Sequence, residues 1–562
     1  MATTNEAPHQ ARCDAALRLS FSSILLSKEE EDSGGYTSIK SPTDAMLEER
    51  SDTLSDGLPL ENGALRHGGV RQLLSREFVG LLVQYGGVGL LYGALPAMLY
   101  PLIQIYLQAS GAQYLTASTL VALPWSFKIF FGMLSDCLPI FNFRRRPYMV
   151  LGWTFCTVTL VYMACMPQES GNGLVDKYTM LMFFATLGYM LTDVAADGLM
   201  VDLAQREPIA LRGRTQSVIY AIRTGMVFVG EVLVAFLFNG KEYDGSFDFS
   251  LDLQEFTVLL ACCSAFVLPM TWFFIKEERR PRIRVRDYLP RLWRLLQRRA
   301  VHQVIAYNFF VGIFSGITMT ATSPIQKLLI HATPLQNALS DVGANLAFTL
   351  AILGTSRWGL QCNWRAVALT TGAVTVFVDG VVTLFVIWDV CRAGVFWFGI
   401  PAAMHFVSGV GWVVNTFVVV ELADLGTEGA VYALITTVHN LASPFAVSLT
   451  RIIDAPFGLT NARIQKDDNS IRVDLTSAAL IMCMSTMFSW SLIFLLPQQK
   501  HQTQQLIRLG GSSKLLGGIT IGYLALAMVW SIVINLMAIN PTTSCLVITG
   551  GNGCSQRRDP LQ

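Results

Sequence analysis

Long apolar runs, each about as long as a bilayer-spanning helix, recur along most of the chain. A spanning helix needs ~20 mostly apolar residues. Twelve such runs fall into two groups of six, near residues 78–107, 115–134, 147–166, 177–203, 212–238 and 253–275, then 301–323, 335–356, 364–388, 394–421, 428–452 and 473–497. A thirteenth lies near 515–539. The pattern predicts an all-α membrane protein of two six-helix bundles with an extra C-terminal transmembrane helix.

Polar intervals divide these runs into five predicted parts. Residues 1–72 are rich in Ser, Glu, Asp and Gly and do not begin with a cleavable signal, so we expect a disordered cytoplasmic arm. This arm is either a flexible tail without a specific function or a segment that acts in regulation or sorting. Residues 73–275 and 301–498 are expected to form the two bundles, joined by a basic cytoplasmic connector at 276–300. Residues 499–562 would hold a cytoplasmic linker, the extra helix and an external tail.

The loop between the second and third runs determines the predicted orientation. Residues 132–146 read Gly-Met-Leu-Ser-Asp-Cys-Leu-Pro-Ile-Phe-Asn-Phe-Arg-Arg-Arg. Clustered arginines next to a span stay on the cytoplasmic side. The N-terminus and the connector then lie on that side too. Thirteen spans would place the C-terminus outside, where Cys545 and Cys554 either form a disulfide or remain free thiols.

Composition and missing motifs exclude several functions. Hydrophobic residues make up 52% of the chain and charged ones 14%, whereas soluble proteins carry about 25% charged residues. The net charge of +1 argues against a nucleic-acid partner. The chain has no phosphate-binding loop, potassium-channel filter, zinc-protease motif or nucleophile elbow. We therefore expect neither an enzyme nor an ATP-driven pump, and no cofactor or metal.

Short sequence matches relate the two groups of runs. Pro101-Leu-Ile-Gln in run 1 is similar to Pro324-Ile-Gln in run 7, and Val201-Asp-Leu-Ala in run 4 is similar to Val420-Glu-Leu-Ala in run 10. Two six-helix halves around a central basic loop are the plan of the major facilitator superfamily. In that fold the halves rock around a site near the bilayer midplane.

Several motifs narrow the resemblance to one family. They are Leu-Pro-Trp-Ser-Phe-Lys at 123–128, Gly-Met-Leu-Ser-Asp at 132–136, Pro-Ile-Phe-Asn-Phe-Arg-Arg-Arg-Pro-Tyr at 139–148, Thr-Asp-Val-Ala-Ala-Asp-Gly-Leu-Met-Val-Asp at 192–202 and Arg-Gly-Arg-Thr-Gln-Ser at 212–217. The loop is longer than the usual superfamily motif. Residues 75–500 resemble the folate–biopterin transporter family of the major facilitator superfamily, most specifically in the first half.

That resemblance implies import of folates or pterins driven by protons. The sequence itself leaves open import or export, and the plasma membrane, which we favour, or an internal membrane. Some members of the family carry other solutes, such as S-adenosylmethionine, so a transporter of another small solute (a nucleoside, amino-acid derivative or sugar) stays open. A receptor or scaffold on a transporter fold is the remaining alternative. Such a receptor has no need of charged side chains inside the bundle.

Four ionisable residues inside the first-half runs are the strongest site candidates. Each costs ~2.5–3.5 kcal/mol to insert, which makes each a functional hypothesis. Lys128 and Arg223 would attract substrate carboxylates. Asp193 and Asp197, spaced i, i+4 and so on one face, would take up a proton. Trp125 would either stack on a flat heterocycle or simply pack; the whole set could also serve only to hold the helices together.

Other polar residues inside the predicted helices are further candidates for substrate or proton binding. Glu231 shares a helical stripe with Arg223 and is a third proton candidate. In the second half, Asn415 and His439 are candidate substrate contacts, with a packing role for His439 as the alternative.

Gating candidates lie at the cytoplasmic ends of the runs. Asp136 is expected to pair with Arg144, Arg145 or Arg146, or with the basic end of a neighbouring helix, as a latch of the outward-open state. We expect Asp202 to gate, or to cap a helix end, through Arg212 or Arg214.

Overall fold

The computed structural model describes residues 63–69, 75–107, 111–166, 174–238, 240–241, 247–279, 284–331, 334–423 and 428–539, with 543, 546 and 548. The chain divides into two units, Met1–His67 and Gly68–Gln562. Every helix named below belongs to the second unit.

The N-terminal half consists of helices at the first six predicted runs. They are α3 (Arg76–Leu99) with η1 (Tyr100–Tyr106), α4 (Gly111–Ala122), η2 (Leu123–Phe127), α5 (Lys128–Cys137), α6 (Arg146–Ala164), α7 (Val175–Ala204), α8 (Arg214–Leu237) and α9 (Leu253–Phe274). The amphipathic connector helix α10 (Val285–Gln297) follows.

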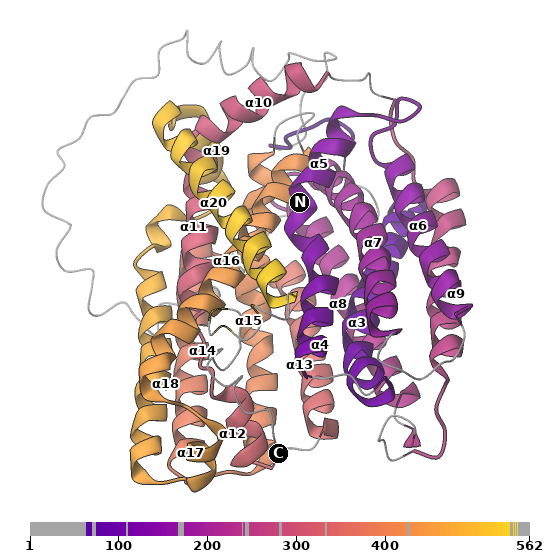
Figure 1. Ribbon diagram of the computed structural model, residues 1–562. Helices are drawn as coiled ribbons and strands as arrows, with labels where there is room; N and C mark the ends of the chain where they lie inside the picture. Colours follow the sequence, from indigo (N-terminus) through magenta and orange to yellow (C-terminus); the bar gives the residue numbers. More distant parts are fainter. Residues whose placement is uncertain are drawn as a thin grey trace, which may run out of the picture. The chain divides into compact units, whose positions relative to one another are not determined.

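The C-terminal half repeats this plan. It comprises α11 (Arg299–Ser315), α12 (Thr322–Leu328), α13 (Pro334–Trp358), α14 (Trp364–Ile387), α15 (Gly394–Leu422), α16 (Glu428–Asp454), η5 (Ala455–Phe457), α17 (Asn461–Lys466), α18 (Asn469–Trp490) and η6 (Ile493–Leu495). The short helix α19 (Lys500–Leu509) and the extra helix α20 (Lys514–Ile539) end the series. Figure 1 shows the two halves in indigo to magenta and in pink to orange, with α20 in yellow.

The predicted fold class is confirmed. Within the described residues, eleven helices are long and apolar enough to span a bilayer. The predicted runs 301–323 and 335–356 are not among them. The first is divided, because α11 ends at Ser315 and the chain resumes as α12 only at Thr322. The second, α13, carries Asp341 and Asn345 among its apolar residues.

Proline divides the second predicted run. Pro124 lies at the start of the 3₁₀ turn η2, between α4 and α5, because proline cannot donate the hydrogen bond that a continuous α-helix needs. The turn frees the Trp125 carbonyl oxygen, which accepts a hydrogen bond of 3.2 Å from Asn440 Nδ2 on α16. The interruption therefore ties the two halves together beside Lys128, the first residue of α5.

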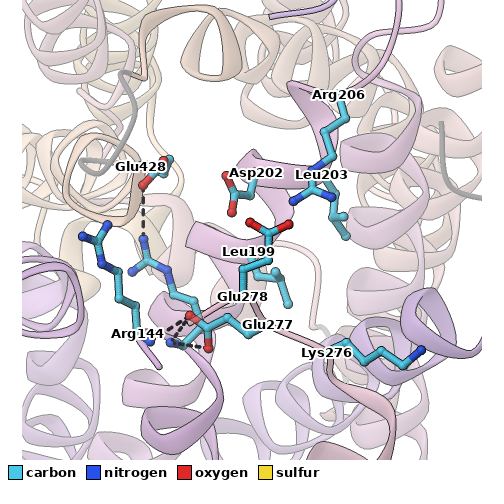
Figure 2. Close-up of a pocket in the computed structure, with 10 residues that line it drawn as sticks. Arg144, Leu199, Asp202, Leu203, Arg206, Lys276, Glu277, Glu278 and Glu428 are labelled. Atoms are coloured by element: carbon cyan, nitrogen blue, oxygen red, sulfur yellow. Dashed lines mark hydrogen bonds and ion pairs between the residues drawn. The ribbon is translucent and has the colours of Figure 1, made fainter. Parts of the chain in front are cut away.

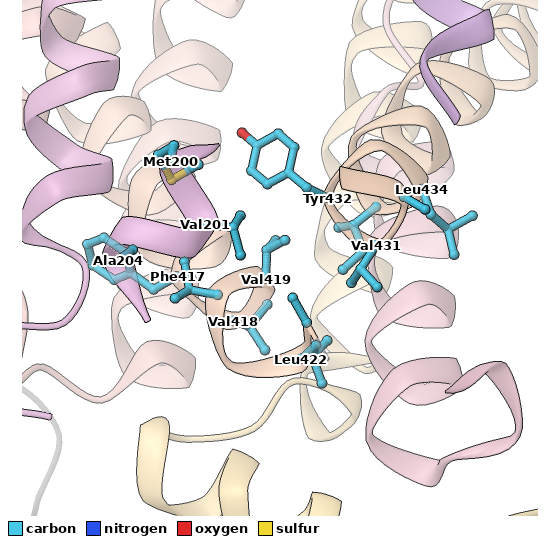
Figure 3. Packing of buried hydrophobic residues seen from close by; sticks show 14 of the residues in the cluster. Met200, Val201, Ala204, Phe417, Val418, Val419, Leu422, Val431, Tyr432 and Leu434 are labelled. Carbon is cyan, nitrogen blue, oxygen red and sulfur yellow. The ribbon is translucent and has the colours of Figure 1, made fainter. Parts of the chain in front are cut away.

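The halves share one apolar cluster at a single end of the bundles. Figure 3 shows α7 meeting α15 and α16 there, with the labelled side chains Met200, Val201, Ala204, Phe417, Val418, Val419, Leu422, Val431, Tyr432 and Leu434. Loops 138–145 and 205–213 and helix α10 lie at this end, which we call the connector side. The protein is therefore described in a state that is closed on the connector side.

Helices α3 and α8 pack so closely that their backbones are in contact. A Cβ atom on Gly93 would overlap the carbonyl oxygen of Val227, and one on Gly89 would overlap that of Arg223. Small residues four apart allow this kind of close packing in membranes. The approach carries Arg223 to the side of α3.

We expect Gly93→Leu to lower the stability of the protein by ~1–3 kcal/mol, because the added side chain forces α3 and α8 apart. The thermal midpoint of the protein purified in detergent measures this. The control is Gly522→Leu on α20, where no atom lies within 4 Å of an added Cβ. Equal midpoints for the two variants would contradict the close-packing argument.

Candidate functional site

Three predicted charges meet inside the N-terminal half. The Nζ atom of Lys128 lies 2.6 Å from Asp193 Oδ2 and 3.1 Å from Asp197 Oδ2. None of the three residues is more than 1% exposed. The 3₁₀ turn sets the position of Lys128 on α5, and the i, i+4 spacing on α7 directs both carboxylates toward it. The structure thus brings together the candidates that the sequence placed on separate helices.

Two further residues complete this ionic cluster. Tyr85 on α3 donates its hydroxyl hydrogen to Asp197 Oδ1 over 2.6 Å. The Nη1 atom of Arg223 lies 3.8 Å from Asp193 Oδ1, an oxygen that has no hydrogen-bond partner in the described chain. Two carboxylates therefore face two cations. Because the Arg223 side chain is 15% exposed, it is the member of the cluster that reaches accessible space.

Aromatic rings hold both cations on a second side. The Arg223 guanidinium carbon lies 5.4 Å from the ring centre of Trp125 and 5.5 Å from that of Tyr92. Lys128 Nζ lies 5.1 Å from the same tryptophan ring, and the two rings are 4.7 Å apart. These distances are in the range of cation–π attraction. Trp125 therefore contacts both predicted substrate-binding cations.

Three other candidates lie outside the ionic cluster. Glu231 accepts hydrogen bonds of 2.9 and 2.8 Å from Asn345 Nδ2 on α13, and it stands eight residues from Arg223, or ~12 Å along a helix. Asn415 lines a cavity within the C-terminal half. The exposed His439 makes no hydrogen bond or ion pair with the described residues. The ring of Trp412 on α15 lies 4.9 Å from that of Tyr220, three residues before Arg223 on α8.

Asp136 joins four separate segments on the connector side. Its Oδ1 accepts a hydrogen bond from the guanidinium of Arg145. Its Oδ2 accepts hydrogen bonds of 2.9 Å from the Tyr288 hydroxyl on α10 and of 2.9 Å from the backbone N–H of Ala430. Ala430 lies in the first turn of α16, where unpaired N–H groups favour an anion. A carboxylate of the N-terminal half thus caps a helix of the other half.

The neighbouring arginines are positioned by an acidic residue that we did not predict. The Glu277 carboxylate accepts backbone hydrogen bonds from Arg144, Arg145 and Arg146, at 2.7, 3.0 and 2.9 Å. It thereby caps the start of α6. Of the three arginines, Arg145 supplies the ion pair with Asp136, and it also lies 3.6 Å from Glu428.

A second buried ion pair crosses between the halves. Arg212 Nη1 donates to both carboxylate oxygens of Glu421, each at 2.7 Å. Gln504 of α19 donates to the same carboxylate at 2.6 Å. Glu421 occupies the position that matches Asp202 in the sequence repeat. Arg212 therefore has a partner in the opposite half, which sequence reasoning had not assigned to it.

Asp202 lines a pocket of about 210 Å³ on the connector side. Figure 2 shows its carboxylate beside Arg206, with Glu277, Glu278 and Glu428 around the same space. Its pairing with Arg212 or Arg214 stays a prediction. Cys545 and Cys554 lie outside the described residues, so their disulfide also stays a prediction.

The comparisons with known proteins agree with this architecture. The family model described as BT1 family matches residues 87–508. The chain belongs to the BT1 family. It is 24% identical over 407 residues to "Folate-biopterin transporter" from Synechocystis sp., covering 68% of this chain and 75% of the relative. It is 21% identical over 401 residues to "Folate transporter 1" from Plasmodium falciparum, covering 68% and 72%.

A solved structure shows the same fold. The proton:xylose symporter XylE, bound to 6-bromo-6-deoxy-D-glucose, aligns with a TM-score of 0.50 at 13% identity, over 79% of this chain and 99% of the other. Together these findings confirm the resemblance carried by residues 123–148. The chain is a multi-pass membrane protein of the BT1 family with the major facilitator fold.

Lys500, at the start of α19, carries a pH-dependent contribution to stability. Its Nζ donates to the Ile209 carbonyl oxygen over 3.0 Å, and the residue is 2% exposed. Burial lowers the pKa of Lys500 to about 8, against ~10.4 in an unfolded chain. Between these values the unfolded chain binds more protons, so stability rises as pH rises from about 8 to ~10.4.

We expect wild type to gain roughly 3 kcal/mol relative to Lys500→Met over this pH interval, because one pKa unit corresponds to ~1.4 kcal/mol. Thermal midpoints of both proteins, measured at intervals from pH 7.5 to 10.5, test this prediction. The difference between the two midpoints should change over this pH range and level off near its two ends. Lys514→Met, at an exposed position on α20, is the matched control. A parallel pH profile for wild type and Lys500→Met would refute the assignment.

Proposed function

We propose that this protein is a proton-coupled secondary transporter of folate- or pterin-type solutes that works by alternating access in the plasma membrane. Its connector side and N-terminus face the cytoplasm in this proposal, as the basic loop 132–146 suggests. The printed names of the Synechocystis and Plasmodium relatives support the substrate class. The observation that carries the proposal is the charge balance of the ionic cluster.

With both carboxylates ionised, Lys128 and Arg223 are fully neutralised by Asp193 and Asp197. An anionic solute that binds Arg223 then adds uncompensated negative charge to a buried site, which is costly. A proton taken up by one carboxylate removes that excess. Solute binding and proton binding therefore favour each other, which is the thermodynamic basis of cotransport.

The residues of the cluster have distinct roles in this mechanism. Arg223 is the direct contact for a solute carboxylate, since its planar guanidinium is partly exposed and suits bidentate recognition. Lys128 holds the two aspartates together, and its ion pair with either one is lost when that aspartate is protonated. Trp125 offers a ring face to the flat part of the solute. Glu231, at the contact between α8 and α13, is a separate proton acceptor.

The connector-side contacts act as the inner gate. Two contacts link the halves in the closed state: Asp136 and Arg145 with the first turn of α16, and Arg212 with Glu421. Both links must break when the halves rock apart to release the solute. The buried charges then gain water, which offsets the loss of their partners.

Uptake of labelled folic acid and biopterin tests the function. The full-length protein is expressed in a cell deficient in pterin transport, with and without a proton uncoupler. We expect uptake of both solutes that the uncoupler abolishes, and Arg223→Gln should weaken folic acid binding by about 10- to 100-fold, the value of a hydrogen bond to a charged group. Arg357→Gln, outside the cluster, is the control.

If wild type reaches the membrane but carries neither solute, the substrate class is wrong. If uptake persists undiminished with the uncoupler, the solute class stands and the proton coupling fails.

Asp136→Asn tests the gate. The amide keeps the shape of the side chain but loses the negative charge that faces Arg145 and the first turn of α16, so we expect normal expression, uptake lowered several-fold and a connector side that opens more often. The alkylation rate of Cys137, which is 3% exposed in the closed state, reports opening in a background that retains only this cysteine. Asp248→Asn, whose side chain is 91% exposed, is the control. Unchanged uptake and alkylation would refute the latch.

A further inference from the structure

The C-terminal half contains a partly open cavity of about 390 Å³. It lies between α11, α14, α15 and α18, and its volume is within the range of small-molecule sites. No lysine, arginine or histidine is among its lining residues. This cavity therefore differs in chemistry from the ionic cluster of the N-terminal half, where two cations meet.

The residues that line the cavity extend along α14 from Ala368 to Asp379. At one end a Cβ on Gly411 would lie 2.6 Å from Thr371 Oγ1, and one on Gly372 would lie 3.0 Å from the Trp490 indole nitrogen. At the other end a Cβ on Gly380 would lie 3.5 Å from the Cys483 sulfur. The two ends, marked by Gly372 and Gly380, are eight residues apart on α14, or ~12 Å. A ligand that contacts both ends of the cavity must have a similar length.

Asp379 supplies a carboxylate at the Cys483 end. It lines the cavity and lies within a membrane-spanning helix, yet no described residue gives it a hydrogen bond or an ion pair. Asn415, nearer the other end, has an Oδ1 atom that is likewise without a hydrogen-bond donor among the described residues. Unpaired acceptors inside a membrane are costly. The cavity therefore suits a ligand with N–H donors, not an anion.

Aromatic side chains line the opposite end. Trp412 and Trp490 both contribute to the wall, and indole faces favour flat rings. Trp412 also contacts Tyr220, which lies one turn before Arg223 on α8. A ligand that starts at Asp379 and passes these rings is thus directed toward the partly exposed Arg223 guanidinium of the N-terminal half.

We propose that Asp379 binds the N–H donor edge of the pterin ring, and so selects the heterocycle while Arg223 selects the carboxylate tail. The 2-amino group and the ring N3–H of a pterin are adjacent donors that match the two oxygens of one carboxylate, as the arginine fork does. This inference rests on the proposed function, because it divides one folate-type solute between the two halves.

Competition for uptake in cells expressing the full-length protein tests it. Four competitors are compared: folic acid, biopterin, p-aminobenzoylglutamate and a folate analogue with a methyl group in place of the 2-amino group. In wild type we expect folic acid to compete about 10- to 100-fold better than the methyl analogue, because the analogue leaves an acceptor unpaired. Asp379→Asn should weaken folic acid and biopterin and abolish this preference, but leave p-aminobenzoylglutamate unchanged.

Two more variants separate recognition from folding. Asp379→Glu keeps the carboxylate and should restore part of the preference for the 2-amino group. Asp389→Asn, in the exposed turn after α14, should match wild type. Surface labelling normalises each measurement to the amount of protein in the membrane.

The alternative outcomes are distinct. If wild type transports folic acid and biopterin but Asp379→Asn keeps the wild-type preference for the 2-amino group, Asp379 does not bind the ring. If Asp379→Asn weakens all four competitors equally, or changes only the sensitivity to an uncoupler, Asp379 is a structural or proton-binding group and the proposal is wrong. If wild type transports neither solute, the proposed function itself fails.

Discussion

Lys128 lies between two carboxylates at a place that water does not reach, and the N-terminal half is arranged around this contact. A buried ion is tolerated only if its partners lie at hydrogen-bond distance. The partners come from other helices: Asp193 and Asp197 from α7, with Arg223 from α8 and Tyr85 from α3 as the next layer. Shifting any one of these helices alone separates a charge from its partner, so the four must move as one body.

The helices that hold the cluster also carry the gate. Asp136 is eight residues beyond Lys128 on α5, or ~12 Å, and Arg212, two residues before α8 begins, precedes Arg223 by eleven residues. Helix α5 therefore has the ionic cluster at its start and an inter-half contact near its end, while α8 carries Arg223 in its third turn and begins two residues after the inter-half contact of Arg212. A change in charge at the cluster can alter the tilt of α5 or α8. Because the same helices reach the gate, this tilt moves the gate contacts directly.

The sequence predicted the members of this arrangement whose chemistry is unusual in a membrane. Lys128, Asp193, Asp197 and Arg223 are conspicuous because charges are rare in apolar runs, and their helical spacing gave the shared face. Tyr85 is not conspicuous, since a tyrosine in an apolar run usually packs. Tyr288 and Glu277 lie in a polar stretch whose pattern does not indicate a buried hydrogen-bond partner. Tyr288 is also 152 positions from its partner Asp136. Contacts over such separations depend on helix packing, which periodicity does not reveal.

The repeat predicted two halves with the same fold and fewer charges in the second, and the structure gives the halves opposite chemistry. Where the N-terminal half places two cations, the C-terminal cavity offers acceptors at Asp379 and Asn415 and no cation. A symmetric solute would gain little from such a division. A solute with an anionic end and an N–H-rich ring gains contacts from both halves only when they lie close together. Its binding energy then stabilises the closed, intermediate arrangement relative to either open one, which is what a rocking transporter requires of its cargo.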